Sequence, residues 1–162
     1  MANTSQLDRG LIVFFRIAMG WTFLYAGVSQ ITNPNFTAAA FLAGTKTFHD
    51  QLAWFALPAI APYTTFLVEW GHTLIGLSLI FGCMVRVSSP FGVLLMAIYY
   101  CAHMDWPYIE SHVNFIVDYH LVYGGVLVYL MANHAGHVWG LDGLIGKLPA
   151  IAHRPVLRPL FD

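Results

Sequence analysis

Four stretches of this 162-residue chain are apolar and long enough to cross a lipid bilayer, which constrains the fold more than any other feature. They cover residues 11–31, 63–85, 87–104 and 112–131. Because the bilayer core holds no water for backbone N–H and C=O groups, such stretches must form helices. Charged residues make up only 9% of the chain, against about 25% in a soluble domain. The sequence therefore predicts an all-α protein, a four-helix transmembrane bundle that forms one domain over residues 1–162.

The connection between the first two stretches, residues 32–62, is long. Within it, residues 36–57 hold two apolar segments that are too short to cross the bilayer. We expect these segments to form short interfacial helices over one end of the bundle. The third stretch is interrupted at its start by Ser88, Ser89 and Pro90. Proline is tolerated in a first helical turn, so we expect the third helix to begin near Pro90.

Basic residues predict how the bundle is oriented. Those near the chain ends and between the second and third stretches are Arg9, Arg86, Lys147, Arg154 and Arg158, whereas the other two connections carry only Lys46. Basic loops stay in the cytoplasm. We therefore expect a multi-pass membrane protein, with both termini and a tail of residues 135–162 in the cytoplasm. The net charge of −1 and the lack of a basic stripe exclude nucleic acid as a partner.

Two carboxylates, Glu69 and Asp118, lie within the predicted membrane helices. A carboxylate in a membrane-spanning helix costs about 2.5–3.5 kcal/mol on insertion scales, so it usually has a partner or a function. Each has a histidine nearby in the sequence, His72 and His120. With the predicted orientation, all four side chains lie in the outer half of the bundle. We take these four residues as the candidate catalytic group.

The other helices bring polar side chains to the same depth. The first contributes Tyr25 and Gln30, and the third contributes Tyr99 and His103. A set of carboxylates, histidines and tyrosines at one level can pass protons and hydrogen-bond the carbonyl oxygens of a quinone. Alternatively, the carboxylates accept hydrogen bonds from their neighbours and hold the helices in register, at about 0.6 kcal/mol each. The sequence leaves both interpretations open.

Metal and haem chemistry receive weaker support. Glu69 and His72 are three residues apart, as in di-iron bundles, but those sites need two such motifs and two further glutamates. A single metal ion held by these two residues with His103 and His120, or a haem with histidine axial ligands, is conceivable. Neither is favoured, because histidines without cysteines are weakly diagnostic of a metal. We therefore assign no metal ligands.

Arg16 lies one to two turns into the first helix, toward the predicted cytoplasmic side. Its side chain can snorkel to the membrane interface. Alternatively, the guanidinium faces the bundle and binds a lipid phosphate, a carboxylate or a partner subunit. We group Arg16 with Tyr99 and His103 as candidate cofactor-binding residues.

Several motifs resemble those of a known family. Residues 16–27, RIAMGWTFLYAG, look like the first-helix signature of the DoxX/DoxD-like integral membrane proteins. Residues 68–72, VEWGH, followed by LIFG at 79–82 and VR at 85–86, resemble the second helix of that family. Residues 137–142, HVWGLD, are similar to the segment that follows its last helix. Together these motifs cover most of the chain.

The resemblance implies a four-helix integral membrane subunit of the prokaryotic inner membrane. Some members of the family belong to thiosulfate:quinone oxidoreductase, which delivers electrons to the quinone pool, and many have no assigned role. Arg16 and Glu69 match charged positions of the family. The histidines at 72, 103, 112 and 120 depart from its general pattern; this departure is consistent with a specialised redox site and argues against a direct transfer of the thiosulfate activity.

Two functions are consistent with these features. The first is a quinone-interacting component of a respiratory oxidoreductase, in which Glu69 or Asp118 accepts protons. The chain has no flavin, iron–sulfur or covalent haem motif, so its electrons must come from a partner or a bound cofactor. The alternative is a non-catalytic accessory or assembly subunit packed against a larger membrane redox complex. Either function implies contact with membrane lipids and with other membrane subunits or further copies of the chain.

Overall fold

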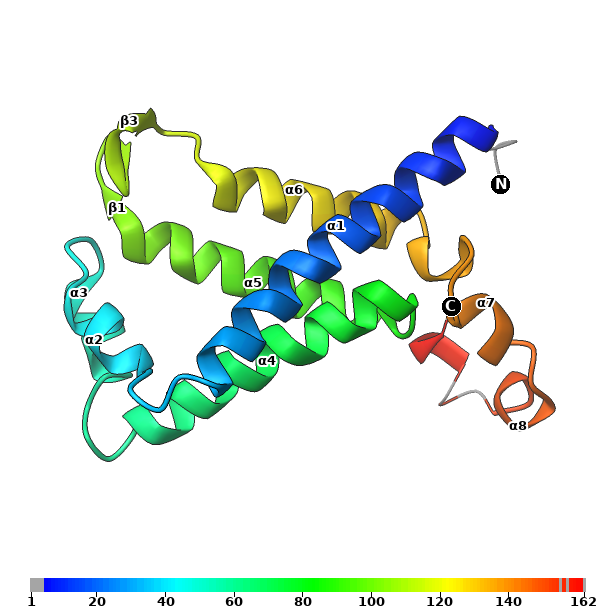
Figure 1. Cartoon of the computed structure of the whole chain (residues 1–162), viewed down its shortest axis with the longest axis horizontal. Helices are drawn as coiled ribbons and strands as arrows, with labels where there is room; N and C mark the ends of the chain where they lie inside the picture. The colour runs from blue at the N-terminus through cyan, green and yellow to red at the C-terminus, as the bar shows by residue number, and fades with distance from the viewer. Residues whose placement is uncertain (1–4, 155, 157, 162) are drawn as a thin grey trace.

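The computed structural model describes residues 5–154, 156 and 158–161; the first four residues and positions 155, 157 and 162 of the predicted tail lie outside it. Four long helices form the bundle: α1 (Gln6–Ile31), α4 (Ala61–Phe81), α5 (Val85–His103) and α6 (Tyr119–Ala132) (Figure 1). By length and composition, α1, α4 and α5 can each cross a membrane. The 14 residues of α6 extend about 21 Å, less than a bilayer core of about 30 Å. The prediction of an all-α membrane bundle is thus confirmed.

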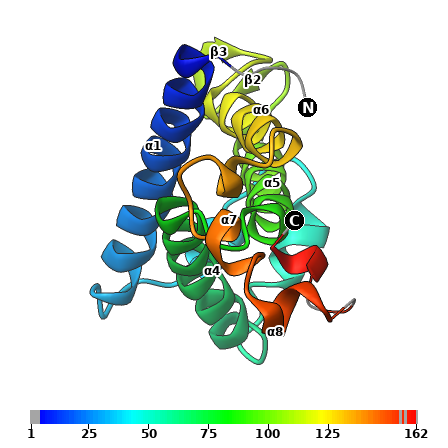
Figure 2. The same ribbon diagram turned by 90° about the vertical axis from the view of Figure 1, so that its right-hand side faces the viewer.

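The four helices pack as two pairs, α1 with α4 and α5 with α6 (Figures 1 and 2). Glycines allow α1 and α4 to approach closely. A Cβ added at Gly76 would lie 2.4 Å from the backbone nitrogen of Leu24, and one at Gly27 would lie 2.6 Å from the backbone nitrogen of Thr73. Small residues at such positions are typical of packed membrane helices. The two pairs diverge toward the end of the bundle that carries the strands (Figure 1).

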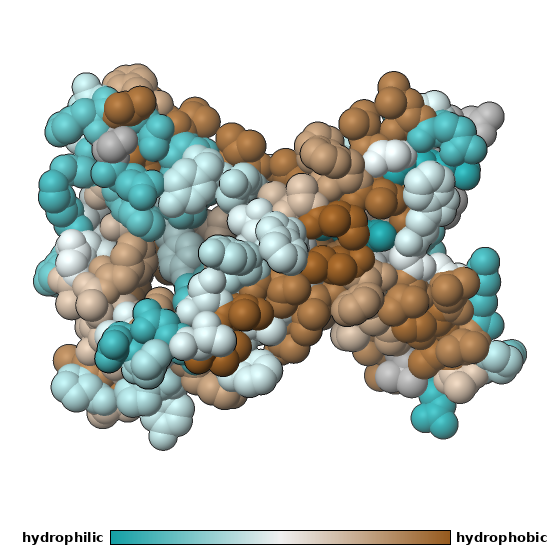
Figure 3. Space-filling model, in the orientation of Figure 1, coloured by the Kyte–Doolittle hydropathy of each residue, from teal (hydrophilic) through white to brown (hydrophobic). Residues whose placement is uncertain are grey.

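Large apolar side chains cover the middle of the molecule, and polar residues gather toward its ends (Figure 3). Many of these side chains are exposed on α1, α4 and α5, including Trp21, Phe66 and Phe91. A soluble protein would bury such a surface, whereas a membrane protein presents it to lipid. The core inside the bundle is formed by a smaller group of buried residues that includes Ile12, Met19, Phe23, Ile75, Leu79, Leu127 and Leu130.

The first connection contains two short helices, α2 (Ala38–Ala43) and α3 (His49–Trp54), within the predicted interfacial segments. The Thr37 side chain caps α2 by accepting a hydrogen bond from the Ala39 N–H. The loop after α2 is attached to the end of α5, because the Thr47 hydroxyl donates to the Met104 carbonyl at 2.8 Å. Lys46 also forms an ion pair with Asp105. The first connection therefore covers the open end between the two helix pairs.

The fourth predicted span was wrong at its start. Residues 112–131 were expected to be one helix, but a small antiparallel sheet precedes α6. It consists of β1 (Met104–Asp105), β2 (Tyr108–Ile109) and β3 (Ser111–Phe115), in that order. The α6 helix begins only at Tyr119 because the Asp118 carboxylate accepts hydrogen bonds from the His120 and Leu121 N–H groups as its N-cap. Asp118 is consequently at a helix end rather than within a span.

The start of α5 also differs from the prediction. The helix begins at Val85, and Pro90 lies inside it. The cause is a carboxylate far away in the sequence: Asp142 accepts hydrogen bonds from the Met84 N–H at 2.6 Å and the Val85 N–H at 3.2 Å. These are backbone donors that have no partner within a helix. A cap supplied by the C-terminal segment thus lets α5 start earlier.

The predicted tail folds back on one end of the bundle. It contains η1 (Ala135–His137), α7 (Asp142–Ile145), α8 (Pro149–Ala152) and η2 (Arg158–Leu160). Backbone hydrogen bonds from Leu141 N to Phe81 O and from Asp142 N to Gly82 O attach it to the turn between α4 and α5. In Figure 2, α7 lies in front of the four helices at this end.

Candidate functional site

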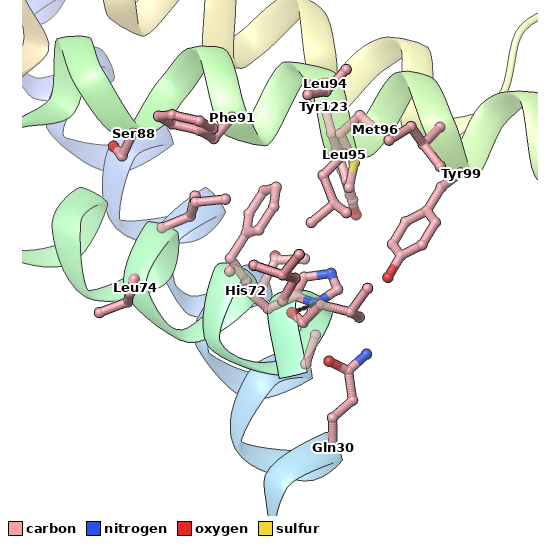
Figure 4. Close-up of a pocket in the computed structure, with 18 of the residues that line it drawn as sticks. Gln30, His72, Leu74, Ser88, Phe91, Leu94, Leu95, Met96, Tyr99 and Tyr123 are labelled. Carbon is pink, nitrogen blue, oxygen red and sulfur yellow. Dashed lines mark hydrogen bonds between the residues drawn. The ribbon is translucent and has the colours of Figure 1, made fainter. Parts of the chain in front are cut away.

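A cavity of about 1250 Å³ lies between the two helix pairs, mainly between α4 and α5 (Figure 4). At one end it is lined by Gln30 and by His72, Tyr99, His103 and His120. We call this the histidine end. The rest of the cavity is mostly apolar and extends along α4 and α5 to the turn between them. The prediction that separate helices bring polar side chains to one level is confirmed for these residues.

The three histidines share one hydrogen-bonding arrangement. The Nδ1 atom of His72 lies 2.9 Å from the Val68 carbonyl, and Nδ1 of His103 lies 2.8 Å from the Tyr99 carbonyl. Nδ1 of His120 lies 2.5 Å from the Asp118 carboxylate. Carbonyl and carboxylate oxygens only accept, so each Nδ1 carries the proton. In the neutral ring Nε2 is then left as a hydrogen-bond acceptor.

Asp118 and His120 form a buried hydrogen-bonded pair. Asp118 is 4% exposed and His120 is 3% exposed. One carboxylate oxygen accepts from the backbone N–H groups of the helix start, and the other accepts from the imidazole. The carboxylate therefore fixes the orientation of the ring and can stabilise its protonated form. Asp118 itself does not line the cavity but lies behind His120.

Aromatic contacts hold the rings at the histidine end in place. Tyr99 stacks on His72 with ring centroids 5.6 Å apart, and His103 stacks on His120 at 5.0 Å. Phe41 of α2 packs on His103 at 4.8 Å. The first connection thus supplies a wall of the site. Figure 4 shows the Tyr99 hydroxyl pointing toward the space between His72 and Gln30.

Gln30 at the end of α1 has a buried amide oxygen with no hydrogen-bond partner among the described residues. Buried polar atoms are normally satisfied, so this oxygen can accept a hydrogen bond from a group in the cavity or, with the amide turned over, from the Tyr99 hydroxyl beside it. Sequence reasoning did not single out Phe41, Tyr119 and Tyr123, which also line this end. Tyr119 and Tyr123 are four residues apart on α6, and this spacing, which places them on one face, was the available signal.

Two residues that were expected to join this group do not face the cavity. Glu69 is half-buried on α4, does not line the cavity and makes no side-chain hydrogen bond or ion pair with any residue that the structure describes. Tyr25 is 65% exposed on α1. Of the two residues spaced three apart on α4, His72 lines the cavity and Glu69 does not. The sequence analysis expected the two carboxylates, Glu69 and Asp118, to meet in one pocket, and they do not.

Arg16 is buried at the other end of the bundle, beside the segment that follows α6. Its guanidinium donates to the carbonyls of Ala135, Val138 and Trp139 at 2.6, 2.9 and 3.2 Å. These contacts attach α1 to the segment after α6. Arg16 therefore holds these two segments together, and the structure does not bring it to the cavity with Tyr99 and His103, with which the sequence analysis grouped it.

Glycines make room for this guanidinium. A Cβ at Gly82 would lie 2.5 Å from an Arg16 nitrogen, and one at Gly140 would lie 2.6 Å from the same atom. Gly82 also has a positive φ of 62°, which ends α4. Burial raises the pKa of the Cys83 thiol in the same turn, and the negative charge of Asp142 acts in the same direction.

Within the part of the chain that the structure describes, no three His, Cys, Asp or Glu side chains converge closely enough to hold a metal ion. The rings of His103 and His120 stack with an interplanar angle of 28°.

Residues 11–104 match the family model described as DoxX. No curated protein and no solved structure matches the chain. The matched region contains α1, α4 and α5, and thus three of the four long helices. It includes His72, Tyr99 and His103, whereas Asp118 and His120 follow it. Since the match covers more than half of the 162 residues, the chain belongs to the DoxX family.

Proposed function

We propose that this DoxX-family membrane protein binds the head group of a quinone at the histidine end and exchanges protons with it, as a subunit of a respiratory oxidoreductase. One observation carries the proposal. Three histidines with occupied Nδ1 atoms line one end of an otherwise apolar cavity. Ligand sites commonly combine an apolar lining with a few convergent polar groups.

The hydrogen-bonding chemistry of these groups suits a reduced quinone. A quinol has two hydroxyl groups, which donate hydrogen bonds, and the neutral imidazole Nε2 atoms accept them. The Tyr99 hydroxyl both donates and accepts, so it can bind either the quinol or the quinone. The Gln30 amide oxygen, which has no partner among the described residues, is a further acceptor. The site thus offers acceptors from α1, α4, α5 and α6.

His120 is the proposed proton acceptor, because Asp118 stabilises its charged form. Oxidation of a quinol releases two protons and two electrons. The protons pass to His120 and then to solvent. The electrons pass to a redox partner subunit, because the chain has no redox-cofactor motif of its own. In this mechanism Asp118 acts through His120 and does not contact the quinol.

Binding of a quinol to the full-length protein in lipid nanodiscs tests the proposal. We expect His120→Phe to weaken quinol binding about tenfold or more, because the variant loses one hydrogen bond to a group that can carry charge. His153→Phe is the control. As in His72 and His103, the Nδ1 of His153 binds the carbonyl four residues before it, at 2.8 Å, but the His153 side chain is exposed and does not line the cavity.

The accessory role gives a different result. If His120→Phe and His72→Phe bind the quinol as the unmodified protein does, but no longer co-purify with a membrane complex, the site is structural and the proposal fails. If quinol binding is lost and co-purification is retained, the redox role is supported.

A further inference from the structure

We infer that the ligand of the histidine end carries a long apolar tail, and that this tail lies along the remainder of the cavity between α4 and α5. The inference rests on the proposed function, because it takes the head group to lie beside His72, Tyr99 and His120. We call the apolar part of the cavity the tail furrow. Among the residues that line it are Leu74, Ser78, Ser88, Phe91, Leu94 and Leu95.

The furrow is continuous with the histidine end, since both belong to one cavity. Figure 4 shows Ser88, Phe91 and Leu94 along α5, on the same side of the cavity as Tyr99. Ser88 and His103 are 15 positions apart on α5, which corresponds to about 22 Å along the helix axis. A single quinone ring is far shorter than this. A head group alone would therefore leave most of the cavity without ligand.

The polar side chains that line the furrow are satisfied by the protein itself. The Ser78 hydroxyl lies 2.5 Å from the Cys83 carbonyl and 2.7 Å from the Ser88 hydroxyl. Thr22 donates to a carbonyl of its own helix. Thr64, which lines the cavity on the other side of His72 from the furrow, donates to the Phe55 and Ile60 carbonyls. Since these groups already have partners, a polar ligand would gain little here. An isoprenoid chain, which makes only apolar contacts, matches this lining.

The furrow is open to the bilayer along its side. Leu74, Phe91 and Leu94 line it, yet they are 59%, 62% and 57% exposed. A ligand dissolved in the membrane can therefore enter between α4 and α5 without passing through water. Lipid tails are as apolar as leucine, so transfer from the bilayer into the furrow gains little hydrophobic free energy. The furrow thus selects and aligns the tail more than it adds affinity. A substitution that blocks the furrow sterically is therefore the sharpest test of the inference.

Leu74→Trp and Leu94→Trp each replace a leucine of the furrow, away from the histidines, by the larger tryptophan side chain. Binding of two quinols to the full-length protein in nanodiscs is measured: one with a long isoprenoid tail and one with methyl groups in place of the tail. We expect each variant to weaken binding of the long-tailed quinol about tenfold and to change binding of the tail-less quinol less than about twofold. Leu11→Trp, on an exposed part of α1 outside the cavity, is the control and is expected to affect neither ligand.

The outcomes separate the two proposals. If both tryptophan variants bind the long-tailed quinol as the unmodified protein does, the tail does not occupy the furrow and the inference is overturned, while the head-group site stands. If the unmodified protein binds neither quinol, the proposed function fails, and the inference fails with it. Equal weakening of both ligands would mean that the tryptophans disturb the histidine end, and would also contradict the inference.

Discussion

The close contact between α1 and α4 leads to a quantitative prediction for Gly76→Ala. The added Cβ would lie 2.4 Å from the backbone nitrogen of Leu24 and 2.7 Å from its Cα. Carbon atoms pack best at about 3.5–4.0 Å, so the two helices must separate by about 1 Å. Backbone atoms cannot rotate away as a side chain can. Overpacking of this kind costs about 1–3 kcal/mol, and the better helix propensity of alanine returns about 0.5–1 kcal/mol. We expect a net loss of about 1–2 kcal/mol in the free energy of unfolding.

Reversible unfolding in mixed detergent micelles measures this free energy, with helicity followed by circular dichroism. Gly71→Ala is the matched control, because it lies on the same helix and an added Cβ would meet no heavy atom within 4 Å. We expect the control to be neutral or slightly stabilising. Equal stability of Gly76→Ala and Gly71→Ala would refute the close packing of α1 on α4, and with it the position of one wall of the cavity.

Three further substitutions test contacts outside the cavity. Arg16→Met removes the hydrogen bonds to the carbonyls of Ala135, Val138 and Trp139, so we expect a loss of about 3 kcal/mol and faster proteolysis after α6, neither of which is expected for the exposed Arg9→Met. Asp142→Ala removes the cap of α5, which is expected to cost about 1–2 kcal/mol and to speed hydrogen exchange at the first amides of that helix; unchanged exchange would contradict the capping. Lys46→Ala breaks the ion pair with Asp105, whose side chains are 71% and 55% exposed, so stability should change by less than about 1 kcal/mol.

The sequence predicted the helices of the bundle well where their limits depend on local features. The first predicted span, residues 11–31, lies within α1, and Gly82 ends α4 near the predicted limit. The prediction was wrong where a cap decided the limit. Residues 112–117 are apolar and were taken as part of a helix, but the Asp118 cap and the pairing of β2 with β3 keep them outside it. An apolar run does not by itself distinguish a short strand from a helix start.

The candidate site was predicted in part. Sequence spacing correctly placed His72, Tyr99 and His103 on helix faces that meet, because each lies in a regular helix. It did not reveal that Glu69 lies outside the cavity, since positions three residues apart on a helix are still offset by about 60°, which turns Glu69 away from the side that carries His72. Nor did it reveal that Asp118 caps α6 and accepts a hydrogen bond from the His120 ring. That pairing depends on the extended conformation of Asp118 before α6.

The sequence by itself determined that this chain forms membrane helices, because a long apolar segment must satisfy its backbone hydrogen bonds internally when water is absent. That requirement depends only on the residues of the segment itself, so it can be assessed for each stretch of the sequence in turn. The tertiary structure decided where the site lies and what it contains. The cavity exists because the two helix pairs diverge, and Arg16 and Asp142 are structural because they bind backbone groups more than 50 residues away. Contacts between segments so distant in the chain depend on the relative positions of the helices, which no single stretch of sequence encodes.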